Sequence, residues 1–217
     1  MSDIFQEVDE EVRRERLEQL WKRYGNHIIA ALFVVVAAVG GWRGYTYWQE
    51  RKAAEAGAAF EAASALADEG KHAEAQAAFA KLATEGTAGY RVLARFREAA
   101  QLSLSDPKAA VAAYEALAAD NSLGQPLQDL ATVRAGLLLV DTAPYDELRT
   151  RLEPLAAADR PFRHTARELL ALGAWRAGDS AAARRWIDMV VSDPETPTGI
   201  RSRVDVLSAL IGGNDKG

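Results

Sequence analysis

The chain has 217 residues, of which 49% are hydrophobic and 26% charged, an ordinary globular composition that excludes wholesale disorder. A formal net charge of −5 argues against a nucleic-acid binder, whose binding face is normally basic. The absence of cysteine excludes disulfides, thiolate metal sites and a cysteine nucleophile, and three histidines leave little material for a histidine metal site. Abundant alanine, with few β-branched residues after residue 50, predicts an all-α fold.

Residues 1–26 are predicted to form a cytoplasmic amphipathic segment. Apolar side chains recur near helical spacing over residues 3–23, and Asp3 with Gln6 is typical of a helix N-terminus. Two roles are open for this helix. It lies at the membrane interface, or it docks the cytoplasmic loop of a partner.

Residues 27–48 are predicted to form a single transmembrane helix. At 1.5 Å per residue this segment spans about 33 Å, enough to cross the hydrocarbon core of a bilayer. Aromatic residues flank it on both sides, which suits headgroup regions. Its one charge, Arg43, lies close enough to the end for its guanidinium to reach the interface. The alternatives are a buried helix of a soluble protein and a cleaved signal peptide, with a mature chain that starts near Gly41.

Lysine and arginine counts in the flanks predict the orientation of this helix. More of them precede the segment than closely follow it, which places the N-terminus in the cytoplasm and the C-terminal part across the membrane. In a Gram-negative bacterium with this protein in its inner membrane, that space is the periplasm. Within the helix, the small residues Ala37, Gly40, Gly41 and Gly44 are candidates for close pairing with another membrane helix.

Residues 53–211 are predicted to form an α-solenoid of about four helical hairpins with the sequence pattern of tetratricopeptide repeats. In the first hairpin, Ala63 and Phe79 occupy the small and aromatic positions of that pattern, and Gly70 occupies the turn. Gly178 is the equivalent turn glycine of the fourth hairpin. The third hairpin is degenerate, because Pro154 must end or kink its second helix. A last helix, 200–210, is predicted to cap the array with Arg201, Arg203 and Asp205 facing outward, and residues 212–217 are predicted to be a flexible tail.

The repeat domain carries none of the sequence motifs of nucleotide-binding loops, serine hydrolases or zinc proteases. No enzymatic activity, cofactor, metal or small-molecule substrate is therefore expected. His72 and His164 are expected at the surface. Matching repeat positions predicts a partner-binding groove along the first helix of each hairpin, with the candidates Phe60, Ser64, Phe96, Glu168, Leu172, Trp175 and Arg176. The alternative for the three aromatic candidates is ordinary packing between hairpins.

Three stretches carry a resemblance over nearly the whole length. They are QEVDEEVRRERLEQLWKRYGNHII, GWRGYTYWQERKAAEAGAAFEAA and LEPLAAADRPFRHTARELLALGAWRAGDSAAARRWI. With them the chain resembles the family of tetratricopeptide-like ancillary subunits of the SecYEG translocon. The resemblance implies a non-catalytic inner-membrane adaptor that handles secretory proteins. The implied partners are Sec translocon subunits, a membrane-anchored periplasmic chaperone of the peptidyl-prolyl isomerase type, and secretory clients.

Two other functions remain open from the sequence. One is a general scaffold of the cell envelope, for division or outer-membrane assembly, which would tolerate any membrane anchor. The other is a binding module released into the periplasm by cleavage.

Overall fold

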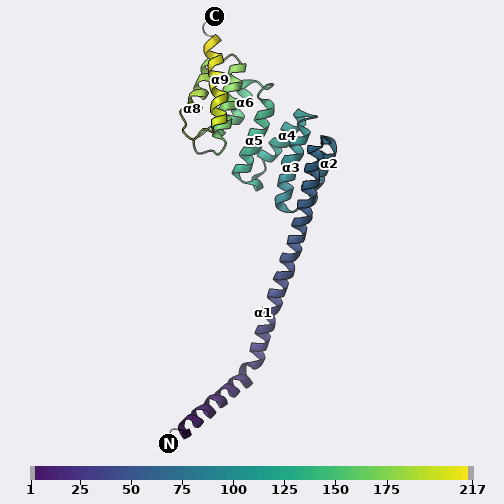
Figure 1. Ribbon diagram of the computed structural model, residues 1–217, viewed down its shortest axis with the longest axis vertical. Coiled ribbons are helices and arrows are strands. Elements are labelled where there is room, and N and C mark those ends of the chain that lie inside the picture. The colour runs from purple at the N-terminus through teal and green to yellow at the C-terminus, as the bar shows by residue number, and fades with distance from the viewer. Residues whose placement is uncertain (1–2, 215–217) are drawn as a thin grey trace. The chain divides into compact units, whose positions relative to one another are not determined.

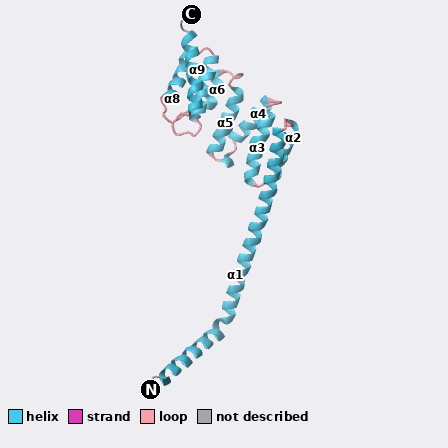
Figure 2. Cartoon of the chain, viewed as in Figure 1, coloured by secondary structure: helices cyan, strands magenta, loops and turns pink. Residues whose placement is uncertain are grey.

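The computed structural model describes residues 3–214, with side chains for residues 14–15 and 18–212. Over residues 3–214 the chain forms helices and loops and no strand (Figure 2), which confirms the all-α prediction. It divides into two compact units, Met1–Ala54 and Glu55–Gly217. The division lies next to the predicted start of the repeat domain at residue 53.

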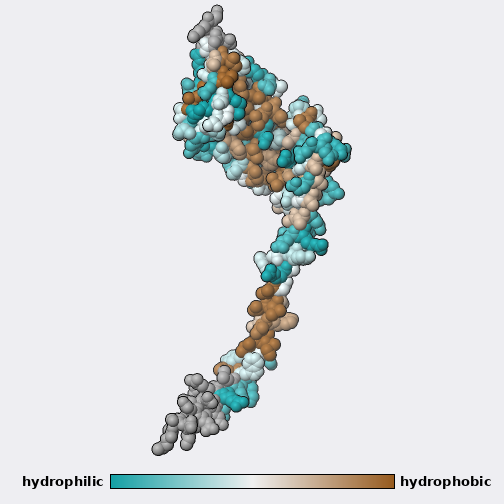
Figure 3. Space-filling view, viewed as in Figure 1, coloured by the Kyte–Doolittle hydropathy of each residue, from teal (hydrophilic) through white to brown (hydrophobic). Residues whose placement is uncertain are grey.

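The first unit consists of a single long helix. Helix α1 runs from Asp3 to Asp68 without interruption, so the helix predicted at 3–23, the apolar segment and the first helix of the repeats share one backbone helix. The described side chains of this unit are almost all exposed, and Phe33, for example, is 75% accessible. The apolar residues form a brown band on α1 (Figure 3). The side chains of residues 1–13 and 16–17, on which most of the predicted amphipathic pattern rests, lie outside the described ones.

The second unit consists of consecutive helices that pack against one another in chain order (Figure 1). The last part of α1 packs on α2, through Phe60 against Phe79. The remaining helices form hairpins α3–α4, α5–α6 and α7–α8, and α9 follows them, as predicted for four hairpins and a cap. Their bounds are α2 His72–Glu85, α3 Ala88–Leu102, α4 Pro107–Ala118, α5 Gln125–Leu139, α6 Tyr145–Leu152, α7 Arg163–Arg176, α8 Ser180–Val191 and α9 Thr198–Asn214.

The turns of the first and last hairpins depend on glycine. Gly70 and Gly178 have φ angles of +77° and +79°, which confirms their predicted role as the residues that reverse the chain. Because a Cβ atom makes this left-handed region unfavourable, other residues are strained there.

Two aspartates cap the second helices of their hairpins. Asp106 Oδ1 accepts a hydrogen bond from the Ala109 amide at 2.9 Å at the start of α4. Asp179 Oδ1 accepts one from the Ala182 amide at 2.8 Å at the start of α8. Each satisfies an amide that has no partner within its own helix, so the chain marks both helix starts in the same way.

Three clusters of buried apolar side chains hold the second unit together. One joins α1, α2 and α3 around Phe79, which is 1% exposed. A second joins α3, α4 and α5 around Tyr114. The third and largest extends from α5 to α9. Phe79 and Tyr114 therefore pack between successive hairpins, as predicted.

The third hairpin and the C-terminal end show two local features. Helix α6 ends at Leu152, and the 3₁₀ turn η2, Glu153–Leu155, follows and contains Pro154, which confirms that this proline ends the helix. Helix α9 extends to Asn214, so residues 212–214 are helical where the sequence predicted a tail. Residues 215–217 of that predicted tail lie outside the described range.

Candidate functional site

Two of the aromatic candidates, Phe60 and Phe96, pack at the edges of the cores of the array. The Phe60 ring centroid lies 5.5 Å from that of Phe79 and 5.9 Å from that of Tyr90. The Phe96 ring lies 6.3 Å from the Tyr114 ring. Both Phe60 and Phe96 are half-buried at the edges of these clusters, which is the packing arrangement given above as the alternative to a groove.

Two further candidates are also half-buried. Leu172 packs against the largest cluster. The Ser64 hydroxyl is buried, and among the described residues no hydrogen-bond partner reaches it. Neither side chain presents a large surface to a partner.

Glu168 is bound within the chain. It is 6% exposed on α7, and its carboxylate accepts two hydrogen bonds from the Arg203 guanidinium of α9, with Arg203 Nη2 at 2.8 Å from Oε2. A partner cannot reach this carboxylate without breaking the pair. Arg203 is exposed, as predicted, and its guanidinium covers this carboxylate from the outer side.

Trp175 and Arg176 at the end of α7 are the exposed members of the candidate set. Trp175 is 38% accessible. Arg176 Nη2 donates to the Ala143 carbonyl in the loop before α6, which orients its side chain. Of the seven candidates, these two offer the most surface to a partner, and their role in binding stays a prediction.

The structure reveals exposed side chains on α3 and α5 that the matching of repeat positions in the sequence missed. Leu93 and Leu137 are 51% and 44% accessible, and Arg97 and Arg134 are exposed beside them. Each arginine directly follows a residue that packs into a core, Phe96 or Val133. The two arginines therefore occupy equivalent positions in successive hairpins. A position-by-position comparison of all four hairpins, rather than of the first and last alone, would have found them.

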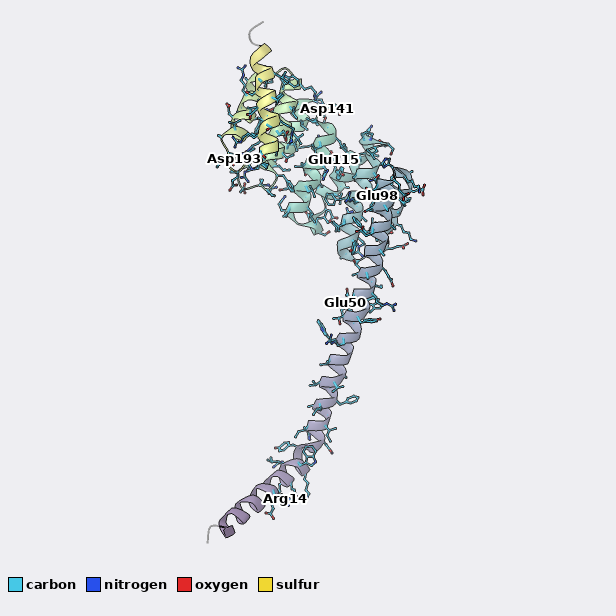
Figure 4. The ribbon with its side chains drawn as sticks, in the orientation of Figure 1. Arg14, Glu50, Glu98, Glu115, Asp141 and Asp193 are labelled. Atoms are coloured by element: carbon cyan, nitrogen blue, oxygen red, sulfur yellow. The ribbon has the colours of Figure 1, made fainter. Side chains whose placement is uncertain are left out.

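A polar cluster ties the loop after α8 to the start of α7. The Asp193 carboxylate, labelled in Figure 4, accepts hydrogen bonds from Arg163 Nε and Arg167 Nη1, both at 2.9 Å. These arginines, Arg163 first, hold the pKa of Asp193 well below its ordinary value. His164 is 8% exposed within this cluster, which corrects its expected surface position.

The contacts within this cluster account for it as a structural feature. Its arginines, histidine and carboxylates satisfy one another, which is what buried charges require. Among the residues the structure describes, no group of three or more histidine or acidic side chains is arranged to hold a metal ion. The cluster therefore fixes the loop before α9 in place.

In the first unit, the small residues predicted for helix pairing are all exposed on α1. A Cβ atom added at Gly40, Gly41 or Gly44 would meet no other atom of the described chain within 4 Å. With Ala37, they lie at i, i+3, i+4 and i+7 and so share one face of the helix. That face is open, and the pairing stays a prediction. Further toward the N-terminus, α1 carries an apolar hollow of about 560 Å³ lined by Leu20, Trp21, Tyr24, His27, Ile28 and Ala31.

Comparison with protein families gives one match. Residues 18–185 match the model of the tetratricopeptide repeat-like domain, and the chain therefore belongs to that family. Comparison with curated proteins and with solved structures gives no match. Domains of this class are typically non-catalytic modules that bind other proteins, so the surface of the array is where function is to be sought.

Proposed function

We propose that this chain is a non-catalytic adaptor of the bacterial inner membrane, anchored by the apolar part of α1, which binds protein partners through its helical repeats. The observation that carries this proposal is that the apolar segment is long and unburied. It is the one stretch of the described residues that is long and apolar enough to cross a membrane, and none of its most apolar window is buried. An unburied apolar stretch of that length costs free energy in water and is stable in a bilayer.

The repeat domain supplies the second half of the proposal. Its three cores are built from residues at and after Ala56. A family match that covers residues 18–185 supports protein binding by this array. The resemblance noted above selects the Sec translocon and a periplasmic chaperone as the partners, with secretory proteins as clients.

The orientation in this proposal has the N-terminus in the cytoplasm and the repeats in the periplasm. It rests on the basic residues that flank the apolar segment. They are Arg13, Arg14, Arg16, Lys22 and Arg23 before it, and Arg51 and Lys52 after it.

A direct test of orientation uses single cysteines, because the natural chain has none. Glu18→Cys and Lys71→Cys lie on the two sides of the segment. In intact cells whose outer membrane is permeabilised, a membrane-impermeant maleimide should label only the cysteine at 71. Labelling at 18 instead would overturn the orientation.

The partner assignment is tested by affinity purification from detergent-solubilised membranes, read by mass spectrometry. The matched control replaces residues 1–48 by an unrelated membrane anchor. Channel subunits and an isomerase-like chaperone that co-purify with the natural chain and vanish in the control support the proposal. Division or outer-membrane assembly proteins that survive the replacement would establish the envelope scaffold in its place.

A further inference from the structure

Many arginines of the repeat domain pair with carboxylates, whereas Arg97 and Arg134 have no such partner among the described residues. Ion pairs engage Arg95, Arg149, Arg151, Arg160, Arg163, Arg167 and Arg203. For Arg97 on α3 and Arg134 on α5, no carboxylate of the described residues lies within 4 Å. Both side chains are exposed.

Two arginines of α3 show that pairing depends on the side of the helix from which the residue projects. Arg95 Nη1 lies 2.6 Å from Asp120 Oδ2 and is half-buried. Arg97 turns to another side of the same helix, where its guanidinium carbon lies 5.9 Å from the Phe60 ring centroid. That cation–π contact orients the group and leaves its hydrogen-bond donors free.

Helix geometry places the two free arginines on one side of the array. On α3, Ala94 packs toward the preceding core and Ala99 toward the following one. On α5, Ala131 packs toward the preceding core and Val133 toward the following one. Arg97 and Arg134 each come three residues after the alanine that faces the preceding core. At 100° per residue, both arginines therefore lie at the same angle from that side of their helix.

Two leucines complete this surface. Leu93 is four residues before Arg97 on α3, and Leu137 is three residues after Arg134 on α5, so each leucine shares a face with its arginine. Tyr114 of α4 is packed between the two helices. Burial raises the pKa of Tyr114, while Arg134 and then Arg97 act to lower it, so both guanidinium groups lie near one phenol.

We propose that the surface formed by Leu93, Arg97, Arg134 and Leu137, here called the arginine–leucine surface, binds a segment of a protein partner that carries carboxylates beside aliphatic side chains. This inference rests on the proposed protein-binding function and specifies the partner's chemistry. Charge complementarity selects the occupant. Free guanidinium groups bind carboxylates in a two-pronged geometry, and the leucines offer apolar contact next to them. A net charge of −5 disfavours general attraction of acidic proteins, so the site acts locally.

The test uses the full chain in the membranes of its own cells. A photo-reactive benzoylphenylalanine replaces Leu93 or Leu137 and, as a matched control, Val206 on α9, which is 63% exposed. After irradiation, the attached segment is identified by mass spectrometry. We expect cross-links at 93 and 137 to a segment with two or more aspartates or glutamates near the attachment point, and few at 206.

Charge reversal separates attraction by the arginines from mere proximity. The double variant Arg97→Glu, Arg134→Glu should reduce the cross-link yield about tenfold. The control Arg91→Glu lies on another side of α3, where Arg91 Nη1 donates to the Gly86 carbonyl, and should leave the yield unchanged. If the double variant melts below the natural chain, the neutral pair Arg97→Gln, Arg134→Gln replaces it, with a smaller loss expected.

The outcomes distinguish this inference from the proposed function. Cross-links to a segment without carboxylates, or a yield that survives charge reversal, would overturn the inference. Cross-links at 206 alone would overturn it too, yet leave protein binding by the array intact. An absence of cross-links at all three positions, together with no co-purified protein, would overturn both.

Discussion

Arg203 on α9 donates through Nη2 to Glu168 Oε2 on α7 at 2.8 Å, and this contact ties the last helix to the first helix of the preceding hairpin. The two side chains differ in environment, because that of Glu168 is 8% exposed and that of Arg203 is 61% exposed. The pair holds a buried carboxylate beneath an accessible arginine.

Removing the arginine should therefore cost more than an ordinary surface ion pair. We expect Arg203→Ala to lower the free energy of unfolding by about 1–3 kcal/mol, since the buried carboxylate then lacks its donors. Arg203→Lys keeps the charge but loses the two-pronged geometry. Its free energy of unfolding should lie between those of the natural chain and Arg203→Ala. Urea unfolding followed by circular dichroism measures both, and an unchanged midpoint for Arg203→Ala would show that the pair does not hold α9.

Gly173 lies where α7 meets α6 with no room for a side chain. A Cβ atom there would come within 2.5 Å of Leu148 Cδ2, and Leu148 is fully buried and cannot swing aside. We expect Gly173→Ala to cost about 1–3 kcal/mol of stability through overpacking.

The control for this prediction is another helical glycine. Gly89→Ala, in the first turn of α3, meets no atom within 4 Å and should be neutral or slightly stabilising. Equal effects of the two substitutions in urea unfolding would contradict the close approach of α6 and α7.

Gly178 tests the conformation of the last hairpin turn. A Cβ atom at this residue meets nothing within 4 Å, so the cost of a substitution is that of its φ of +79° alone. We expect Gly178→Val to lower stability by about 1–3 kcal/mol, because a β-branched residue is strained in this region. Asparagine tolerates a positive φ better than valine, so Gly178→Asn should lower the stability less. A melting temperature unaffected by valine would show that the turn adopts another conformation.

The repeat pattern predicted the fold well because it consists of packing positions. Small residues such as Ala63, the turn glycines and the inter-hairpin rings Phe79 and Tyr114 each have a local steric role that spacing reveals. Pro154 ended its helix for a similarly local reason.

The surface was harder to predict, because exposure depends on which helices pack together. Glu168 reads as a groove residue until Arg203, which follows it by 35 residues, covers it. Phe60 and Phe96 read as groove aromatics, yet both rings pack against core aromatics of their own hairpins and are half-buried. The lack of a carboxylate partner for Arg97 and Arg134 among the described residues depends on which side chains the fold brings near them, so the sequence does not show it. His164 was expected at the surface because it starts a helix, yet the loop after α8 folds over it.

We expect the stability of the last hairpin to depend on pH through His164. The Thr196 hydroxyl donates its proton to the Val190 carbonyl at 2.7 Å, so the hydroxyl oxygen accepts from His164 Nδ1 at 3.0 Å. This network holds the neutral ring with its proton on Nδ1. Burial, and next the charge of Arg163, lower the pKa of His164 below its ordinary value of 6.5, against the opposing effect of Asp193.

The sign of the pH effect follows from this lowered pKa. Below pH 6.5 the unfolded chain binds a proton at His164 that the folded chain does not, so the stabilising contribution is complete above that pH and is lost as pH falls toward the folded pKa. We expect the urea midpoint to decrease between pH 7.5 and pH 5.5. His164→Asn keeps a donor for the Thr196 hydroxyl and removes the titration, so the decrease should be smaller in this variant. The same decrease in both proteins would show that another group carries the proton, and a midpoint that rises on acidification only in the natural chain would show that the folded state holds His164 charged.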